Sequence, residues 1–163
     1  MEYPQYDYAV IGGDMRQVYL TEQLSQESRV THYGLANVPD IHRCNDFLPI
    51  EASSLDEAVG SSRCIVCPIP FSKNGIHLNQ NILKENIPIT TLLDNLKPGQ
   101  LFFGGCIPDD FKRTATEKNI FIYDLMEDFA LATYNTLATA EGAICEAIIR
   151  SPLNLHQSQC AVL

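Results

Sequence analysis

A glycine-containing turn near the start of the chain holds the first residues that could do chemistry. Gly12 and Gly13 follow an apolar run, and Asp14, Arg16 and Gln17 come directly after them. A guanidinium beside the free amides of a helix start can bind a carboxylate through two parallel hydrogen bonds. The turn therefore predicts a carboxylate-binding site centred on Arg16. The alternative is an arginine exposed on a helix, which the surface preference of arginine alone favours.

The same turn lacks the pattern of a dinucleotide-binding loop. Of the three glycines in that pattern only Gly12 fits, because Asp14 and Gln17 stand where the second and third belong. A carboxylate at Asp14 would also repel a pyrophosphate at the helix start. We therefore expect no cofactor binding by this turn, and we expect Asp14 and Gln17 to cap the following helix as a capping box.

A second polar group lies late in the chain, inside a helix otherwise suited to burial. Asn135, Thr139 and Glu141 are its main members. Polar groups in such a place need partners or a ligand, so these residues are candidates for ligand binding. The alternative is structural: Thr139 caps a new helix and Glu141 complements the dipole of its first turn, and the residues alone favour this role.

No metal site is expected. Cys64 and Cys67 are three residues apart, but residues at that spacing on a strand point to opposite faces, and the chain has no second pair of this kind. Reduced, buried cysteines are the better interpretation. The histidines show no ligand spacing either; they are His32, His42, His77 and His156.

The composition excludes several classes of partner. Lys and Arg total 11 against 20 Asp and Glu, which gives a net charge of −9, and no basic cluster occurs. Nucleic acid and anionic membrane surfaces are therefore poor partners. No segment resembles a leader peptide or a membrane span, so we expect a cytoplasmic protein. The length allows one domain and a trailing segment.

The elements that would position these residues alternate between strand and helix. Strands are expected at residues 8–11, 29–33, 63–67, 100–104 and 120–123. Helices are expected after the first glycine turn and at residues 55–58, 78–85, 91–96, 109–118 and 126–150, with a loop at residues 68–75. This order predicts an α/β fold with a doubly wound, five-stranded, mainly parallel sheet in a three-layer sandwich, either Rossmann-like or flavodoxin-like.

In such a sheet, functional groups gather beyond the carboxyl ends of the strands. That edge would collect the first glycine turn, the loop at residues 68–75, the turn at residues 104–106, and Asp124. The last eight residues, 156–163, have the pattern of an apolar strand that stops as it begins. We therefore expect residues 1–150 to form one α/β domain, and residues 151–163 to form a linker and the first strand of a nicotinamide-binding Rossmann domain beyond this chain.

Three segments resemble the amino-terminal domain of the dipicolinate synthase A subunit. They are residues 10–17, residues 134–135 with 139–144, and residues 158–163, in the same order as in that family. Ala138 departs from the family, which more usually has proline there. The match brackets nearly the whole chain, whereas residues 39–119 agree only in general pattern.

The resemblance implies an oxidoreductase that converts a dihydrodipicolinate-type diacid to dipicolinate during sporulation, in the cytoplasm of the mother cell. NADP or NAD would be the acceptor, held mainly by the domain beyond this chain. The dipicolinate synthase B subunit and further copies of the chain are the implied protein partners. This domain would hold the diacid and form one wall of the cleft, so the isolated chain is expected to be inactive. The predicted substrate-binding residues are Gly12, Gly13, Asp14, Arg16, Gln17, Asn135, Thr139 and Glu141; no catalytic residue is assigned.

Two other functions stay open. The chain could be a regulatory or docking module without its own ligand, which a solvent-facing Arg16 and an apolar surface patch elsewhere would favour. It could also be a free-standing nucleotide-binding domain, which requires anion binding at Gly12 and Gly13. Convergence of Arg16, Asn135 and Thr139 on one cleft would favour substrate binding.

Overall fold

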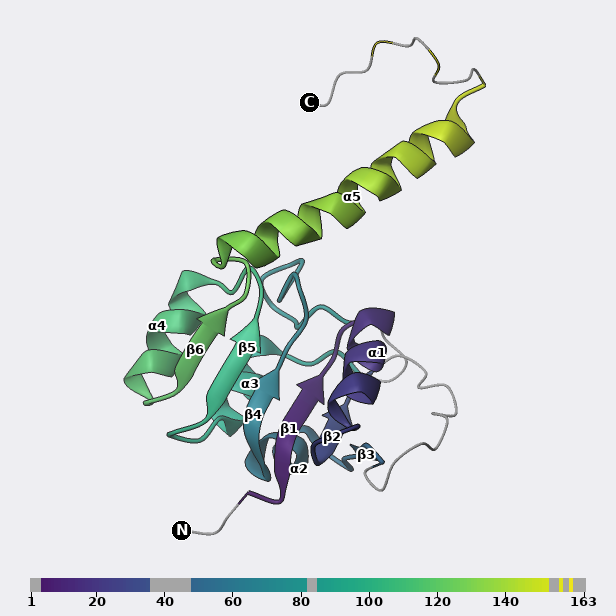
Figure 1. The fold of residues 1–163 in the computed structure, drawn as a ribbon. Coiled ribbons are helices and arrows are strands. Elements are labelled where there is room, and N and C mark those ends of the chain that lie inside the picture. Colours follow the sequence, from purple (N-terminus) through teal and green to yellow (C-terminus); the bar gives the residue numbers. More distant parts are fainter. Residues whose placement is uncertain (1–3, 36–47, 82–84, 153–155, 157–158, 160–163) are drawn as a thin grey trace. The chain divides into compact units, whose positions relative to one another are not determined.

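The computed structural model describes residues 4–35, 48–81, 85–152, 156 and 159. The chain divides into two compact units, Met1–Leu125 and Met126–Leu163. Figure 1 shows the strands and the shorter helices of the first unit and the long helix of the second.

The first unit contains one parallel sheet. In chain order its strands are β1 (Tyr6–Ile11), β2 (Val30–Tyr33), β3 (Ile50–Glu51), β4 (Ser62–Val66), β5 (Leu101–Gly104) and β6 (Phe121–Asp124). In space they run β3-β2-β1-β4-β5-β6, and every neighbouring pair is parallel (Figure 1). The doubly wound α/β fold is confirmed, in the Rossmann-type strand order. The sheet has six strands rather than five, because the two-residue β3 is too short to show a periodic pattern.

The helices are α1 (Met15–Leu24), α2 (Leu55–Gly60), α3 (Ile89–Asn95), α4 (Asp109–Glu117) and, in the second unit, α5 (Phe129–Arg150). They agree with the expected helices apart from small shifts at the ends. The helix expected at residues 78–85 was wrong for its described part, residues 78–81 and 85. Here Leu78 N–H donates to Ile87 O over 2.8 Å and Asn79 N–H donates to Phe71 O over 2.8 Å. These bonds to other segments hold residues 78–81 extended and replace the bonds of a helix.

Two apolar layers hold the strands. On one face, Ala9, Ile65 and Phe102 pack with side chains from α2, α3 and α4. On the other face, Val10, Val30 and Val66 form a smaller cluster to which α1 contributes Leu24. Both faces of the central strands are thus buried, as a parallel sheet requires. The carboxyl ends of β1, β4 and β5 are thereby fixed at one edge, where the predicted site residues of this unit begin.

The second unit is dominated by α5. Asp128 caps it, with Leu131 N–H donating to Asp128 Oδ1 over 2.9 Å. The helix is continuous through Thr139 for 22 residues, so no new helix begins there. The strand expected at residues 156–163 falls almost wholly outside the described residues. No helix in the described part of the chain is both long and apolar enough to cross a membrane.

Candidate functional site

The glycine turn at the end of β1 is closed by hydrogen bonds within the chain. Gly12 and Gly13 have φ of 64° and 92°, which favours glycine. Gly12 N–H donates to Tyr33 O over 2.9 Å, and Gly13 N–H donates to Asn79 O over 2.9 Å. Asn81 N–H returns a bond of 2.9 Å to Gly13 O. Residues 79–81 therefore lie against the turn, and the two glycine amides already have partners.

The start of α1 has the expected capping box. Asp14 Oδ1 accepts from Arg16 N–H over 3.0 Å, and Gln17 Oε1 accepts from Asp14 N–H over 3.0 Å. The turn packs tightly against this cap, because a Cβ added at Gly13 would come within 2.3 Å of Gln17 Oε1. The prediction for Asp14 and Gln17 is confirmed. A consequence is that the amides of Asp14 and Arg16 are also satisfied internally.

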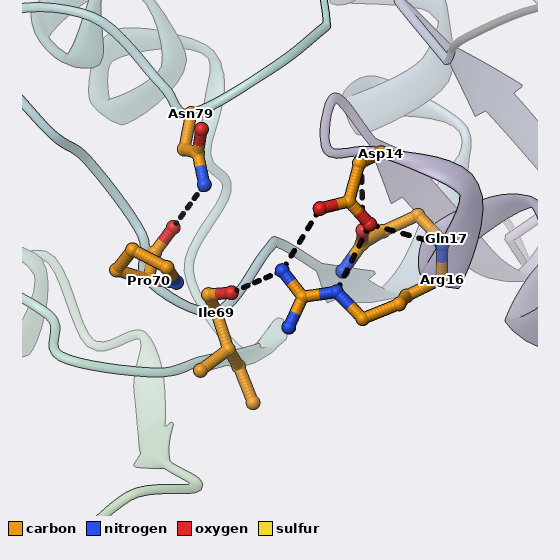
Figure 2. Close-up of polar contacts among 6 residues, drawn as sticks. All are labelled: Asp14, Arg16, Gln17, Ile69, Pro70 and Asn79. Atoms are coloured by element: carbon orange, nitrogen blue, oxygen red, sulfur yellow. Dashed lines mark hydrogen bonds and ion pairs between the residues drawn. The ribbon is translucent and has the colours of Figure 1, made fainter. Parts of the chain in front are cut away.

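Arg16 already binds a carboxylate, and that carboxylate is Asp14. Its Nε donates to Asp14 Oδ1 over 3.0 Å and its Nη2 to Asp14 Oδ2 over 2.9 Å, the paired geometry expected for a ligand (Figure 2). Nη2 also donates to Ile69 O over 2.8 Å, whereas Nη1 has no partner among the described residues. The bonds from Arg16 lower the pKa of the Asp14 carboxyl, and Asp14 raises the pKa of Arg16. The sequence did not predict this internal partner of Arg16.

The loop after β4 is held beside Arg16 through the carbonyl groups of Ile69 and Pro70. Asn79 Nδ2 donates to Pro70 O over 3.1 Å beside the bond from Arg16 to Ile69 O (Figure 2). Phe71, fully buried, anchors the loop in the core. The sequence placed this loop at the site edge but did not single out Ile69, Pro70 or Asn79. No spacing rule connects them to Arg16, since 53 residues separate Arg16 from Ile69.

Asp124 lies at the carboxyl end of β6 and accepts hydrogen bonds from the turn after β5. Its Oδ1 accepts from Cys106 N–H over 3.0 Å, and its Oδ2 accepts from Ile107 N–H over 2.8 Å and from Lys112 Nζ over 3.0 Å. The Asp124 side chain is only 4% exposed. These contacts satisfy a buried carboxylate with backbone amides and an ammonium, which is a structural arrangement.

The late polar residues lie on α5. Thr139 Oγ1 donates to Asn135 O over 3.1 Å, one helical turn back, and Asn135, Thr139 and Glu141 are all exposed. They belong to the second unit, whereas Gly12, Gly13, Asp14, Arg16 and Gln17 come together in the first. The meeting of the two groups in one cleft stays a prediction.

Neither cysteine of the Cys64 and Cys67 pair is accessible. Both are buried and unbridged, and burial raises the pKa of each thiol. Within the described ranges, no three His, Cys, Asp or Glu side chains gather closely enough to hold a metal ion.

Comparison with known proteins identifies relatives of this fold. The family described as the N-terminal domain of the dipicolinate synthase A subunit matches residues 7–126. The solved structure of dipicolinate synthase, A chain, from Bacillus subtilis has a TM-score of 0.66 and 21% identity, and covers 98% of this chain and 52% of its own. The dipicolinate synthase A subunit from Bacillus halodurans has a TM-score of 0.70 and 19% identity, with 95% and 52% covered.

A more distant structure has the same fold. The holo form of D-mandelate dehydrogenase from Rhodotorula graminis has a TM-score of 0.52 and 14% identity, covering 90% of this chain and 49% of its own. At these identities the three structures show the fold alone. This chain spans about half the length of each. No curated protein sequence matches it.

Proposed function

Because this chain belongs to the family of dipicolinate synthase A-subunit N-terminal domains, we propose that it is the substrate-side domain of an NAD(P)-dependent oxidoreductase. The reaction is oxidation of a dihydrodipicolinate-type diacid to dipicolinate during sporulation, in the mother-cell cytoplasm. The observation that carries the proposal is the closed glycine turn with Arg16 at the carboxyl edge of the sheet. That edge is where ligands of open α/β sheets bind.

The closed turn supports a division of labour between two domains. Gly12 and Gly13 direct their amides to protein oxygens, and Asp14 adds a negative charge where a pyrophosphate would lie. NADP or NAD would supply the hydride acceptor, and in this proposal a further Rossmann domain holds it, with residues 151–163 leading into that domain. The isolated chain is then inactive, because the acceptor must lie against the substrate ring.

Arg16 is the residue that we assign to one substrate carboxylate. Gly12, Gly13 and Gln17 keep the backbone around it in place, and Asp14 orients its guanidinium through the bonds to Nε and Nη2. Nη1 is the guanidinium nitrogen that has no partner among the described residues, so it can make the first contact with an incoming anion. Charge-assisted bonds of this kind are the strong ones in carboxylate recognition.

Asn135, Thr139 and Glu141 are proposed as further substrate-binding residues, as the sequence predicted. Asn135 and Thr139 are four residues apart on α5, so they share one face of the helix. Their side chains are exposed and carry the donors and acceptors that a cyclic diacid can use. The dipicolinate synthase B subunit and further copies of the chain are the proposed protein partners.

A docking module is the second candidate, because Arg16 faces solvent and α5 has an exposed apolar surface. Ile144, Cys145, Ile148 and Ile149 line this surface together with Glu141. Ile149 is 71% exposed. Apolar surface of this kind marks contact sites. The free-standing nucleotide-binding domain is disfavoured by the closed turn.

Steady-state kinetics of the complete enzyme tests the proposal. Arg16→Ala is expected to lower kcat/KM by about ten- to a hundredfold, corresponding to roughly 1.5–3 kcal/mol for a charge-assisted contact. Arg16→Lys should recover little, because an ammonium cannot reproduce the planar fork.

Arg113→Ala is the matched control. Arg113 is also an exposed helix arginine that pairs with a nearby aspartate, Asp110, at 2.7 Å. This variant should leave kcat/KM unchanged. If Arg16→Ala also leaves it unchanged, Arg16 does not bind substrate, and the Asn135 and Thr139 side becomes the better candidate.

A further inference from the structure

Two of the three guanidinium nitrogens of Arg16, Nε and Nη2, already donate hydrogen bonds within the protein. Nε and Nη2 hold both oxygens of Asp14, and Nη2 also reaches Ile69 O. An incoming carboxylate can therefore make contact only through Nη1 while Asp14 stays in place. Bidentate binding, which gives both strength and orientation, requires Asp14 to leave that edge.

We propose that Asp14 is an internal competitor for Arg16, and that a carboxylate of the bound diacid takes the place of the Asp14 carboxylate on the Nε and Nη2 edge. This inference rests on the proposed function, in which Arg16 binds substrate. It assigns Asp14 as the residue that sets the affinity of the site for dicarboxylates. In this proposal Asp14 weakens substrate binding, although the sequence predicted it as a substrate-binding residue.

The surrounding contacts let this exchange happen without disturbing the fold. The Arg16 and Asp14 side chains are 57% and 32% exposed, and ion pairs this accessible contribute little to stability. Asp14 Oδ1 also accepts from the Arg16 backbone amide, and that bond does not depend on the guanidinium. Gln17 keeps its bond to the Asp14 backbone, so the helix start stays capped while the guanidinium changes partner.

The charge of Asp14 opposes the binding of a second anion at Arg16. The bonds from Arg16 lower the pKa of Asp14 and keep it ionised, and Lys73, in the loop after β4, adds a smaller lowering. When the charge of Asp14 is removed, Arg16 acts on the ligand without an opposing carboxylate, and anion affinity rises.

The test is calorimetric titration of this chain with dipicolinate at low ionic strength. Asp14→Asn is expected to lower Kd by about two- to fivefold, the size of one exposed charge pair. Asp14→Ser should act in the same direction, because both residues still cap the helix. Adding Arg16→Ala to Asp14→Asn should abolish the gain. Melting curves establish that each variant is folded.

Asp110→Asn is the matched control. It removes the same charge from the first turn of α4 and releases Arg113 from an exposed ion pair of 2.7 Å. No tightening of dipicolinate binding is expected. Equal Kd for wild type and Asp14→Asn, no binding by Asp14→Asn, a gain that survives Arg16→Ala, or the same gain in Asp110→Asn would each overturn the proposal.

The kinetics of the complete enzyme separate this inference from the function on which it rests. If Arg16→Ala slows the enzyme but Asp14→Asn shows no gain, the proposed function stands and the competitor role fails. If Asp14→Asn tightens binding through Arg16 but Arg16→Ala leaves turnover unchanged, the competitor role stands and the substrate role of Arg16 in the proposed function fails.

Discussion

His32 and Arg16 show how the environment shifts the pKa values of two basic side chains of one unit in opposite directions. Arg16 is exposed and paired, and its pKa is raised by Asp14. His32 lies on β2 with 7% of its surface exposed, and its Nδ1 has no hydrogen-bond partner in the described structure. Burial lowers the pKa of His32, and Glu51 acts weakly in the opposite direction. His32 is therefore neutral in the folded state at neutral pH.

The lowered pKa of His32 predicts a loss of stability in mild acid. The unfolded chain binds a proton near pH 6.5 and the folded chain does so only at lower pH, so the unfolded state takes up more protons as the pH falls. The free energy of unfolding should decrease from pH 7 to 5.5, by at most about 1.4 kcal/mol per pH unit. Urea unfolding of wild type and His32→Gln across this range measures it. Parallel pH profiles of the two proteins would refute the role of His32.

At the scale of elements, the turn after β1 is held from two sides. The capping box of α1 fixes its helical side, and residues 79–81 fix the other through the bonds of Gly13 with Asn79 and Asn81. Gly13 is the residue that joins the two, since its N–H and C=O both take part. Its φ of 92° and the closeness of Gln17 leave no room for a side chain.

Gly13→Ala should therefore destabilise the first unit by about 2–3 kcal/mol. A left-handed backbone costs an alanine about 1–2 kcal/mol, and displacement of Gln17 costs about 1 kcal/mol of helix capping. Gly75→Ala separates the two effects, because Gly75 has φ of 72° with no atom within 4 Å of an added Cβ. Gly75→Ala should therefore lower the free energy of unfolding only by the cost of the left-handed backbone. Chemical denaturation of both variants gives the comparison, and equal losses would show that the contact with Gln17 has no effect.

At the scale of the whole molecule, the proposed two-domain enzyme requires this chain to be a poor cofactor binder. Its Rossmann-type sheet has the usual position for a dinucleotide, but the amides of Gly12 and Gly13 are bonded to the protein. In the proposed function, this chain supplies substrate contacts rather than the nicotinamide site.

Titration with NAD and NADP checks this point. Neither cofactor should bind the chain saturably in the low micromolar range, because the helix start has no free glycine amides and carries Asp14. Asp14→Asn should not restore binding, since Gly13 N–H remains bonded to Asn79 O. Micromolar binding by wild type would contradict the division of labour. Binding by Asp14→Asn alone would show that charge, and not the closed turn, excludes the cofactor.

The local features of this protein could be predicted from its sequence. Apolar runs ended by glycine located β1 and β5, and the pair of Asp14 and Gln17 indicated the capping box. Such features depend on residues within a few positions of one another, so a window of sequence contains their cause. The alternation of these elements was then enough to predict a doubly wound parallel sheet.

Tertiary structure decided the features that join distant segments. The two-residue β3 exists because β2 offers it a neighbour, and residues 78–81 stay extended because Phe71, Ile87 and Gly13 supply their backbone partners. The same holds for the site. A sequence shows that Arg16 can bind a carboxylate, but only the fold brings Ile69 O within 2.8 Å of its guanidinium. Hydrogen bonds between residues more than fifty positions apart follow from the packing of the whole core, which no local pattern contains.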